Sequence, residues 1–357
     1  MRERRQWVRL ALYLCGFTIL LVSMISCFGV GPKDLDLPRE RIVWPPPPAP
    51  ARVEYVRSFR TPRDLGIRRN WLVRFFSYLA RGRRNFQMAR PYAIAVTSDG
   101  KIVVADPDAR SVHVYDLERT RYKRITRAAG SLLVSPVGVA ADLEGRIYVS
   151  DSYRKAIFRF DPKGEWIDTL GDEGDLLRPT GLAFDRQRNR LYVTDTLGHR
   201  LVAYSTDGEK VLDLGKRGEE AGAFNYPVAV AVDPSGRLYV TDSMNFRVQI
   251  LAEDGRVLRV FGKQGYGAGD FDKIKGVALD ADGHVYVVEA LHDVIHVYGP
   301  EGKFLTAIGG TGTGPGEFWL PTGIHIDGSG RILIADSANH RVQMLQYLGE
   351  PEGGAEL

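Results

Sequence analysis

Residues 227–251 read PVAVAVDPSGRLYVTDSMNFRVQIL, and residues 321–345 repeat the arrangement as PTGIHIDGSGRILIADSANHRVQML. Each stretch holds a small apolar run, a turn containing glycine, an alternating run that closes on an acid, and a third apolar run. Repeats of about 40–50 residues with several strand-like runs each are typical of propeller blades. The closing acid recurs six times, at spacings of 44 to 47 residues, at Asp106, Asp151, Asp195, Asp242, Glu289 and Asp336.

The repeat unit predicts four short strands. Turn residues separate the apolar runs, and no helical periodicity competes with the strand pattern. A single blade cannot bury both of its faces, whereas a closed ring of blades buries them and removes the exposed sheet edges. We therefore predict an all-β fold, a six-bladed β-propeller of four-stranded antiparallel blades over residues 51–348, followed by a C-terminal tail at 349–357.

The last repeat offers only three strands, of which the third lies at residues 341–348. Residues 51–59, ARVEYVRSF, alternate like the outer strands of the other units. We predict that this N-terminal strand completes the final blade, with Val53 and Tyr55 pairing with the 341–348 strand.

The repeated residues resemble a known family. The pattern P-x-G-[IV]-A-x-D-x-x-G-x-[IL]-Y-V-x-D-[ST]-x-N-x-R-[VI], followed by G-x-G-x-G-x-F, is similar to the NHL repeat, with its best copies at residues 227–271 and 321–344. The resemblance covers about residues 51–348 and implies a six-bladed propeller. Together with the N-terminus it implies a bacterial lipoprotein.

Residues 1–27 have the layout of an export signal. Four arginines precede the apolar run of residues 10–26, as in a secretory signal peptide. Met24 to Cys27 (MISC) resembles a lipobox, which would make Cys27 the lipidated first residue of the mature protein. The alternative is an uncleaved membrane anchor, for which seventeen apolar residues are short. Both alternatives place the propeller in the cell envelope, outside the cytoplasm.

Amino-acid composition and charge indicate which kinds of partner the protein can bind. Residues 28–50 are rich in proline and predict a semi-rigid tether. Residues 1–90 carry 18 basic and 6 acidic side chains, which leaves 30 basic and 38 acidic side chains for residues 91–357. An acidic, exported propeller argues against a nucleic-acid partner. Cys15 and Cys27 are the only cysteines, so the propeller has no disulfide, and we expect a monomer.

Residues 60–90 depart from the repeat. They hold nine arginines against one aspartate, and the apolar residues at 71–79 share one face of a short amphipathic helix predicted over 70–80. The helix docks on the propeller, engages a partner protein, or lies on an anionic membrane surface. The sequence leaves these alternatives open.

Catalytic motifs are missing, because the sequence has no HExxH and no G-x-S-x-G. The repeated acid precedes an arginine by five residues in the best copies, and this spacing predicts a structural clamp. We therefore predict a non-enzymatic module, with no catalytic residue and no cofactor, that binds a protein, peptide or glycan of the envelope. Its expected ligand face is the loop position four residues after each acid, occupied by Arg110, Lys155, His199, Phe246, Asp293 and His340.

The alternative hypothesis is a metal-dependent enzyme, an NHL-type lyase or a lactone hydrolase. The resemblance to NHL-type amidating lyases implies a zinc-binding histidine in D-x-x-x-H-x-V, which the stretches after Asp195 and Asp336 match in part at His199 and His340. His325 stands where the other five repeats have alanine. These three histidines are the candidate ligands for zinc or calcium at the channel mouth, although a catalytic zinc site needs all three close together.

Overall fold

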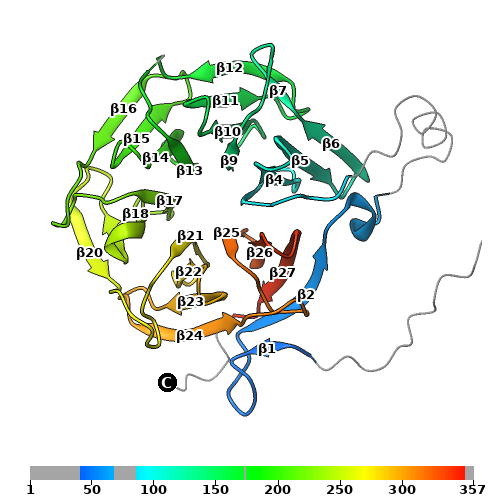
Figure 1. The fold of residues 1–357 in the computed structure, drawn as a ribbon, viewed down its shortest axis with the longest axis vertical. Coiled ribbons are helices and arrows are strands. Elements are labelled where there is room, and N and C mark those ends of the chain that lie inside the picture. Colours follow the sequence, from blue (N-terminus) through cyan, green and yellow to red (C-terminus); the bar gives the residue numbers. More distant parts are fainter. Residues whose placement is uncertain (1–40, 68–85, 173, 350–357) are drawn as a thin grey trace, which may run out of the picture. The chain divides into compact units, whose positions relative to one another are not determined.

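The computed structural model describes residues 41–67, 86–172 and 174–349. The chain divides into two compact units, Met1–Arg41 and Ile42–Leu357. The second unit is a ring of six β-sheets around a central axis, as Figure 1 shows. The prediction of an all-β six-bladed propeller is confirmed.

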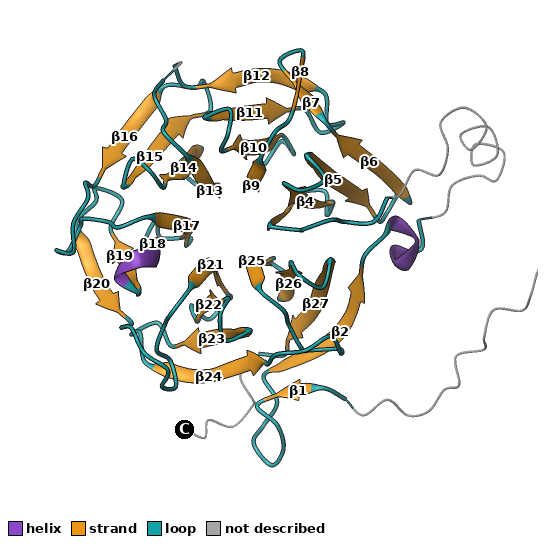
Figure 2. Ribbon diagram, viewed as in Figure 1, coloured by secondary structure: helices purple, strands orange, loops and turns teal. Residues whose placement is uncertain are grey.

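Each blade has its first strand at the axis and its last strand at the rim (Figure 2). Blade 1 consists of β3 (Ala93–Val96), β4 (Ile102–Asp106), β5 (Ser111–Asp116) and β6 (Arg121–Ile125). Blade 2 consists of β9 (Pro136–Ala141), β10 (Ile147–Asp151), β11 (Ala156–Phe160) and β12 (Trp166–Leu170). Blade 3 consists of β13 (Pro179–Asp185), β14 (Arg190–Asp195), β15 (Arg200–Ser205) and β16 (Lys210–Leu214). Blade 4 consists of β17 (Pro227–Val232), β18 (Leu238–Asp242), β19 (Arg247–Leu251) and β20 (Val257–Phe261). Blade 5 consists of β21 (Ile274–Leu279), β22 (Val285–Glu289), β23 (Val294–Tyr298) and β24 (Phe304–Gly309). Blade 6 consists of β25 (Pro321–Ile326), β26 (Arg331–Asp336), β27 (Arg341–Tyr347) and β2 (Val53–Phe59). The minor elements are β1 (Val43–Trp44), the hairpin of β7 (Arg127–Ala128) and β8 (Ser131–Leu132), and the 3₁₀ turns η1 (Pro62–Leu65) and η2 (Ser243–Asn245).

The strand register defines two ends of the ring. In blade 4, Pro227 pairs with Asp242, and Asp242 pairs with Arg247. The chain entering the first strand, the repeated acid and the loop after it therefore share one end, which we call the acid end. The turns between the first and second strands, and between the third and fourth strands, lie at the other end, which we call the turn end.

The turn end uses residues that tolerate a left-handed backbone. Gly236, in the first turn of blade 4, has a φ of 89°, a conformation that costs glycine nothing. Blade 3 has a longer turn in which Asn189 takes the left-handed position with a φ of 52°. Asparagine is among the few other residues that accept this conformation readily.

The core lies between adjacent blades, where the faces of neighbouring sheets meet. Tyrosines on the second strands of blades 2 to 5 are at most 1% exposed. In blades 2, 4 and 5 the hydroxyl donates to a carboxylate in the turn, as when Tyr148 donates to Asp142 at 2.9 Å and Tyr286 donates to Asp280 at 3.1 Å. These three side chains bury a large apolar ring while the hydroxyl remains hydrogen-bonded, whereas the hydroxyl of Tyr192 in blade 3 is buried without a partner among the described residues.

The N-terminal strand closes the ring. Val53 pairs with Tyr347, and Tyr55 pairs with Leu345, so the predicted closure by β2 and β27 is confirmed. The expected boundary between tether and propeller at residues 50 and 51 is wrong, because β1 pairs with β2 through Val43 and Glu54. The end of the proline-rich segment is therefore a fifth strand of the last blade, and Trp44 packs against the core between blades 5 and 6.

Two predicted features, a helix and an export signal, lie in parts of the chain that the structure does not describe. The amphipathic helix at 70–80 and the export signal at 1–27 lie outside the described residues. Within the described ranges, no helix has the length and apolar character needed to cross a bilayer.

Candidate ligand-binding end of the propeller

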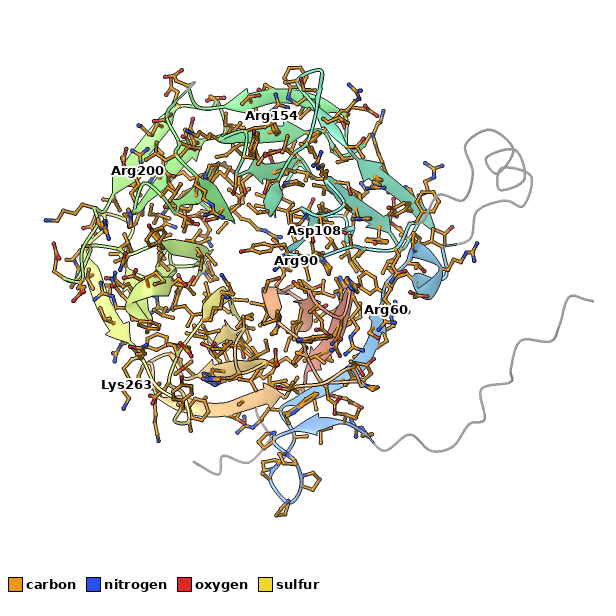
Figure 3. The ribbon with its side chains drawn as sticks, in the orientation of Figure 1. Arg60, Arg90, Asp108, Arg154, Arg200 and Lys263 are labelled. Atoms are coloured by element: carbon orange, nitrogen blue, oxygen red, sulfur yellow. The ribbon has the colours of Figure 1, made fainter. Side chains whose placement is uncertain are left out.

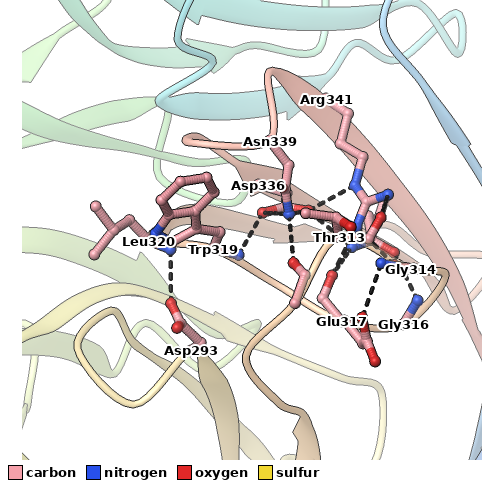
Figure 4. Close-up of polar contacts among 12 residues, drawn as sticks. Asp293, Thr313, Gly314, Gly316, Glu317, Trp319, Leu320, Asp336, Asn339 and Arg341 are labelled. Atoms are coloured by element: carbon pink, nitrogen blue, oxygen red, sulfur yellow. Dashed lines mark hydrogen bonds and ion pairs between the residues drawn. The ribbon is translucent and has the colours of Figure 1, made fainter.

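The repeated acid is a structural clamp. Asp336 accepts hydrogen bonds from the backbone N–H of Trp319 at 2.8 Å, from Nε of Arg341 at 2.6 Å and from Nε2 of Gln343 at 2.9 Å (Figure 4). The side chain of Asn339 donates a further bond to it at 2.9 Å. Asp336 is fully buried, so its charge is stabilised entirely by these donors.

The other repeats use their acids in the same way. Asp195 contacts Arg200 at 3.1 Å, which confirms the predicted pairing at a spacing of five residues. Glu289 has no such arginine and instead accepts the backbone N–H groups of Asp272, Lys273 and Leu291. All six repeated acids are fully buried, and each accepts at least one backbone N–H group.

The position four residues after each acid has a left-handed backbone in every blade. The φ angles there lie between 47° and 57°, although none of the six residues is glycine. Such a conformation costs a residue with a Cβ roughly 1 kcal/mol. The residues are those predicted for the ligand face: Arg110, Lys155, His199, Phe246, Asp293 and His340.

Three of these side chains tie one blade to the next. Nδ1 of His199 accepts the backbone N–H of Tyr226 at 3.2 Å. Figure 4 shows the corresponding contact between blades 5 and 6, where Oδ1 of Asp293 accepts the backbone N–H of Leu320 at 2.7 Å. Nδ1 of His340 donates to the backbone oxygen of Ala89. These contacts explain why a side chain is kept at a left-handed position, since glycine could not form them.

The remaining members of that ring have different surroundings. Phe246 packs against the core between blades 4 and 5. Arg110 and Lys155 are exposed at the acid end. Four of the six residues of the predicted ligand face thus pack or bond within the ring, and three of the six, Arg110, Lys155 and His340, are exposed.

The sequence analysis missed an apolar surface at the same end. Two residues after the repeated acid, successive blades 2 to 5 carry large side chains that are 44% to 75% exposed. These four residues, which we call the apolar arc, are Tyr153, Leu197, Met244 and Leu291. Trp319, at the entry to blade 6, and Tyr266, in the connection to blade 5, are also exposed at this end. The sequence contained this pattern, because the apolar arc follows the repeated acid by two residues as regularly as the predicted ligand face follows it by four.

The histidines of the metal hypothesis do not come together. His199 and His340 lie at the acid end of blades 3 and 6, whereas His325 pairs with Leu333 in the half of the strand toward the turn end. Among the described residues, the group with three candidate ligand atoms within 4.8 Å is Asp280, Asp282 and His284.

That group is held by hydrogen bonds from within the protein. Nδ1 of His284 lies 2.8 Å from Asp280, and the hydroxyl of Tyr347 donates to Asp282 at 2.7 Å. The three side chains therefore have a structural role in the first turn of blade 5.

The half of the axial channel toward the turn end is lined by apolar strand residues and by charged residues of the turns. A cavity of about 410 Å³ is lined there by the first strands of all the blades. Arg186, in the longer turn of blade 3, is the one lysine or arginine among its lining residues. Burial lowers the pKa of His325 to about 4, and the charges of Arg186 and Arg331 act in the same direction against Asp327. His325 is thus a neutral group of the channel wall at neutral pH.

Known proteins share this architecture. A family model described as "6-bladed beta-propeller" matches residues 97–216 and 279–348, and an NHL repeat model matches residues 224–251. A virginiamycin B lyase from Staphylococcus aureus is similar at 17% identity with a TM-score of 0.55, over 73% of this chain and 96% of that one. A gluconolactonase from Xanthomonas campestris is similar at 18% identity with a TM-score of 0.55, over 73% of this chain and 87% of that one.

A structural genomics protein of unknown function from Bacteroides thetaiotaomicron has 15% identity and a TM-score of 0.58, over 74% of this chain and 70% of that one. At these identities the likeness to solved structures extends to the fold alone.

Proposed function

Because the chain belongs to the family of 6-bladed beta-propellers, whose ring leaves the loops of each end free to vary, we propose that it is a non-enzymatic binding module. Its ligand is a protein or peptide of the cell envelope, held at the acid end. The observation that carries the proposal is the apolar arc, which spans four successive blades on one end of the ring. Contiguous exposed apolar side chains on a soluble domain mark interaction sites.

The state of the repeated acids supports binding over catalysis. A general acid or base needs a proton-accepting atom within reach of substrate, whereas Asp106 already accepts the backbone N–H groups of Ala89, Arg90 and Ala109. The acidic group that recurs in every blade is thus committed to holding the loops. Those loops differ from blade to blade at the exposed positions, as a specific recognition surface requires.

The proposal includes a location. Residues 1–27 would anchor the chain through a lipid on Cys27 or through an uncleaved helix, with the propeller on the far side of the inner membrane. Metabolic labelling with a radioactive fatty acid tests this directly. Label on the natural chain and none on Cys27→Ser is the expected result, and an unlabelled natural chain of full length would favour the uncleaved anchor.

The binding function is tested by capture from detergent-solubilised envelope. We expect Tyr153→Ser/Leu197→Ser/Met244→Ser to lose a partner that the natural chain retains, since exposed apolar anchors contribute most to protein interfaces. The control Val211→Ser/Leu258→Ser removes apolar groups of similar exposure, 41% and 40%, from the outer strands of blades 3 and 4. Equal capture by all three proteins, or capture by none, would contradict the proposal.

A further inference from the structure

The connections that enter the first strands carry cations in alternate blades. The residue just before the strand position of Pro91 is arginine, lysine or a neutral side chain, depending on the blade. In blades 1, 3 and 5 it is a cation, and in blades 2, 4 and 6 it is neutral, in the chain order Arg90, Ser135, Arg178, Tyr226, Lys273 and Leu320. The three cations thus stand at alternate positions around the axis at the acid end.

The backbone of each of these cations is fixed by the repeated acid. The N–H groups of Arg90 and Arg178 donate to Asp106 and Asp195 at 2.9 and 2.7 Å, and that of Lys273 donates to Glu289 at 2.8 Å. The clamp therefore holds the base of each cationic side chain beside the channel. Figure 3 shows Arg90 at the edge of the central opening.

The three cations surround the mouth of the channel, because each stands at the entry to an innermost strand. Burial raises the pKa of the Tyr92 hydroxyl, and the charges of Arg178, Arg90 and Lys273 oppose that rise. Tyr92 is thus a group whose charge state responds to cations from three separate blades. Tyr92 itself stands two residues after Arg90, at the start of the innermost strand of blade 1.

A fourth cation lies deeper in the mouth. Lys275 is half-buried at the blade 5 position that matches Tyr92. Burial lowers the pKa of its ammonium group, and Arg178 and Arg90 lower it further against the opposing charge of Glu289. Glu289 does not neutralise Lys275 by an ion pair, because its oxygens accept the backbone N–H groups described above. Among the described residues, no acid forms an ion pair with any of the four cations.

Arg90, Arg178 and Lys273 are exposed, whereas Lys275 is half-buried and is the cation for which a missing counter-charge costs most. Lysine is seldom buried without a partner, and like charges gathered around one channel mouth repel each other. The gathering is also local, since residues 91–357 have more acidic than basic side chains. A low-dielectric channel wall beside these charges strengthens their attraction for an anion.

We infer that the acid end of the axial channel is a binding site for a compact oxyanion with two or more negative charges, a phosphate or a cluster of carboxylates, held by Arg90, Arg178, Lys273 and Lys275. The inference rests on the proposed function, because the site lies at the same end as the apolar arc. It adds the chemistry of the ligand: an anionic group at the centre of an interface whose outer part is apolar. Arginine supplies the planar, paired donors that phosphate and carboxylate groups accept.

The test uses the full chain in detergent, with pyrophosphate and a tricarboxylate as separate probes and calorimetry as the readout. We expect saturable binding of one anion per chain by at least one probe, and at least a tenfold loss of affinity in Arg90→Gln/Arg178→Gln/Lys273→Gln. Tight binding of pyrophosphate alone assigns the site to phosphate groups, and comparable binding of both assigns it to oxyanions in general.

A matched control removes three cations from the opposite end. Lys163, Arg256 and Lys303 are exposed in the turns between third and fourth strands, and their replacement by glutamine changes the net charge equally. We expect this variant to bind as the natural chain does. No saturable binding of either probe, or equal losses in the two triple variants, would overturn the inference.

The two proposals fail separately. Anion binding is measured without any macromolecule, so Tyr153→Ser/Leu197→Ser is expected to leave it unchanged. Failure of the natural chain to capture any partner, with intact anion binding, would sink only the proposed function. Capture of a partner by a chain that binds neither probe would sink only the anion site.

Discussion

Carboxylates at the acid end and at the turn end are stabilised over very different distances along the chain. Asp336 accepts its backbone hydrogen bond from Trp319, 17 residues away, whereas Asp327 pairs with Arg331, four residues away, at 2.8 Å. Blades 2 and 4 repeat the local pairing through Asp142 with Arg146 and Asp233 with Arg237. The repeated acids thus join segments that are distant in sequence, whereas the aspartates that follow the first strands stabilise their own hairpins.

This difference indicates which end of the ring is suited to hold a binding site. The turn end adds contacts between side chains of neighbouring blades, because Arg188, beside Asn189 in the longer turn of blade 3, pairs with Glu253 of blade 4 at 2.6 Å. The clamps at the acid end hold the connections between blades in fixed positions. A fixed set of loops around one axis can place side chains from several blades against a single ligand.

The largest expected effect separates the two kinds of carboxylate. Asp336→Ala should lower the free energy of unfolding by about 3–5 kcal/mol, because it leaves a buried arginine without its partner; Arg341 is 4% exposed. Asp327→Ala should cost about 1 kcal/mol, since its partners retain contact with water. Urea denaturation of both variants measures the difference. Similar losses would show that the two ends do not differ in this respect.

A second prediction concerns pH and the turn end. Folding holds the pKa of His325 at about 4 against a reference of 6.5, so the unfolded chain binds the proton more readily. Stability due to this group is complete above pH 6.5 and is lost as the pH falls toward 4. His325→Ala restores the alanine of the other repeats, and we expect it to raise the free energy of unfolding at pH 5 by up to about 2 kcal/mol.

Thermal unfolding at pH 7 and pH 5 provides the measurement. The natural chain should lose more stability than His325→Ala between these values. His284→Gln is the control, because His284 lies in the turn of the neighbouring blade with Asp280 as its partner. A pH dependence that His325→Ala leaves unchanged would count against the position of this group in the channel wall.

The smallest effect is expected at the acid end of the channel. Folding lowers the pKa of Lys275, so the buried charge costs stability at neutral pH and the cost disappears as the pH rises past the ordinary lysine value of about 10.4. Lys275→Met should therefore be more stable than the natural chain at pH 7, with a gain that shrinks at strongly alkaline pH. Addition of pyrophosphate should reverse the order at pH 7, since it supplies the missing counter-charge. Equal stability of the two chains across this pH range would contradict the claim that Lys275 lacks a counter-charge.

The sequence could predict the ring because each blade repeats the same local pattern. Alternation, turn glycines and the spacing of the acids are all properties of short segments, and even the closing strand carried a recognisable alternation in residues 51–59. The pairing of β1 could not be read, because two residues beside four consecutive prolines carry no strand pattern of their own.

The site was harder to predict, for a physical reason. A position such as His199 looks exposed in a repeat alignment, yet its ring accepts an N–H from the next blade, which only the packed ring brings near. The cations Arg90, Arg178 and Lys273 lie far apart in sequence, and a net charge summed over many residues hides them. Their placement around one channel mouth depends on the angular order of the blades around the axis, which local patterns do not contain.

Closure by the first strand has a consequence for biosynthesis. Val53 cannot find Tyr347 until nearly three hundred intervening residues have been made, so the nascent chain carries β2 as an open edge throughout synthesis. Contacts between such distant partners form slowly, and open edges invite pairing with other chains. The protein should therefore depend on chaperones for longer than a propeller whose every blade is complete within one repeat.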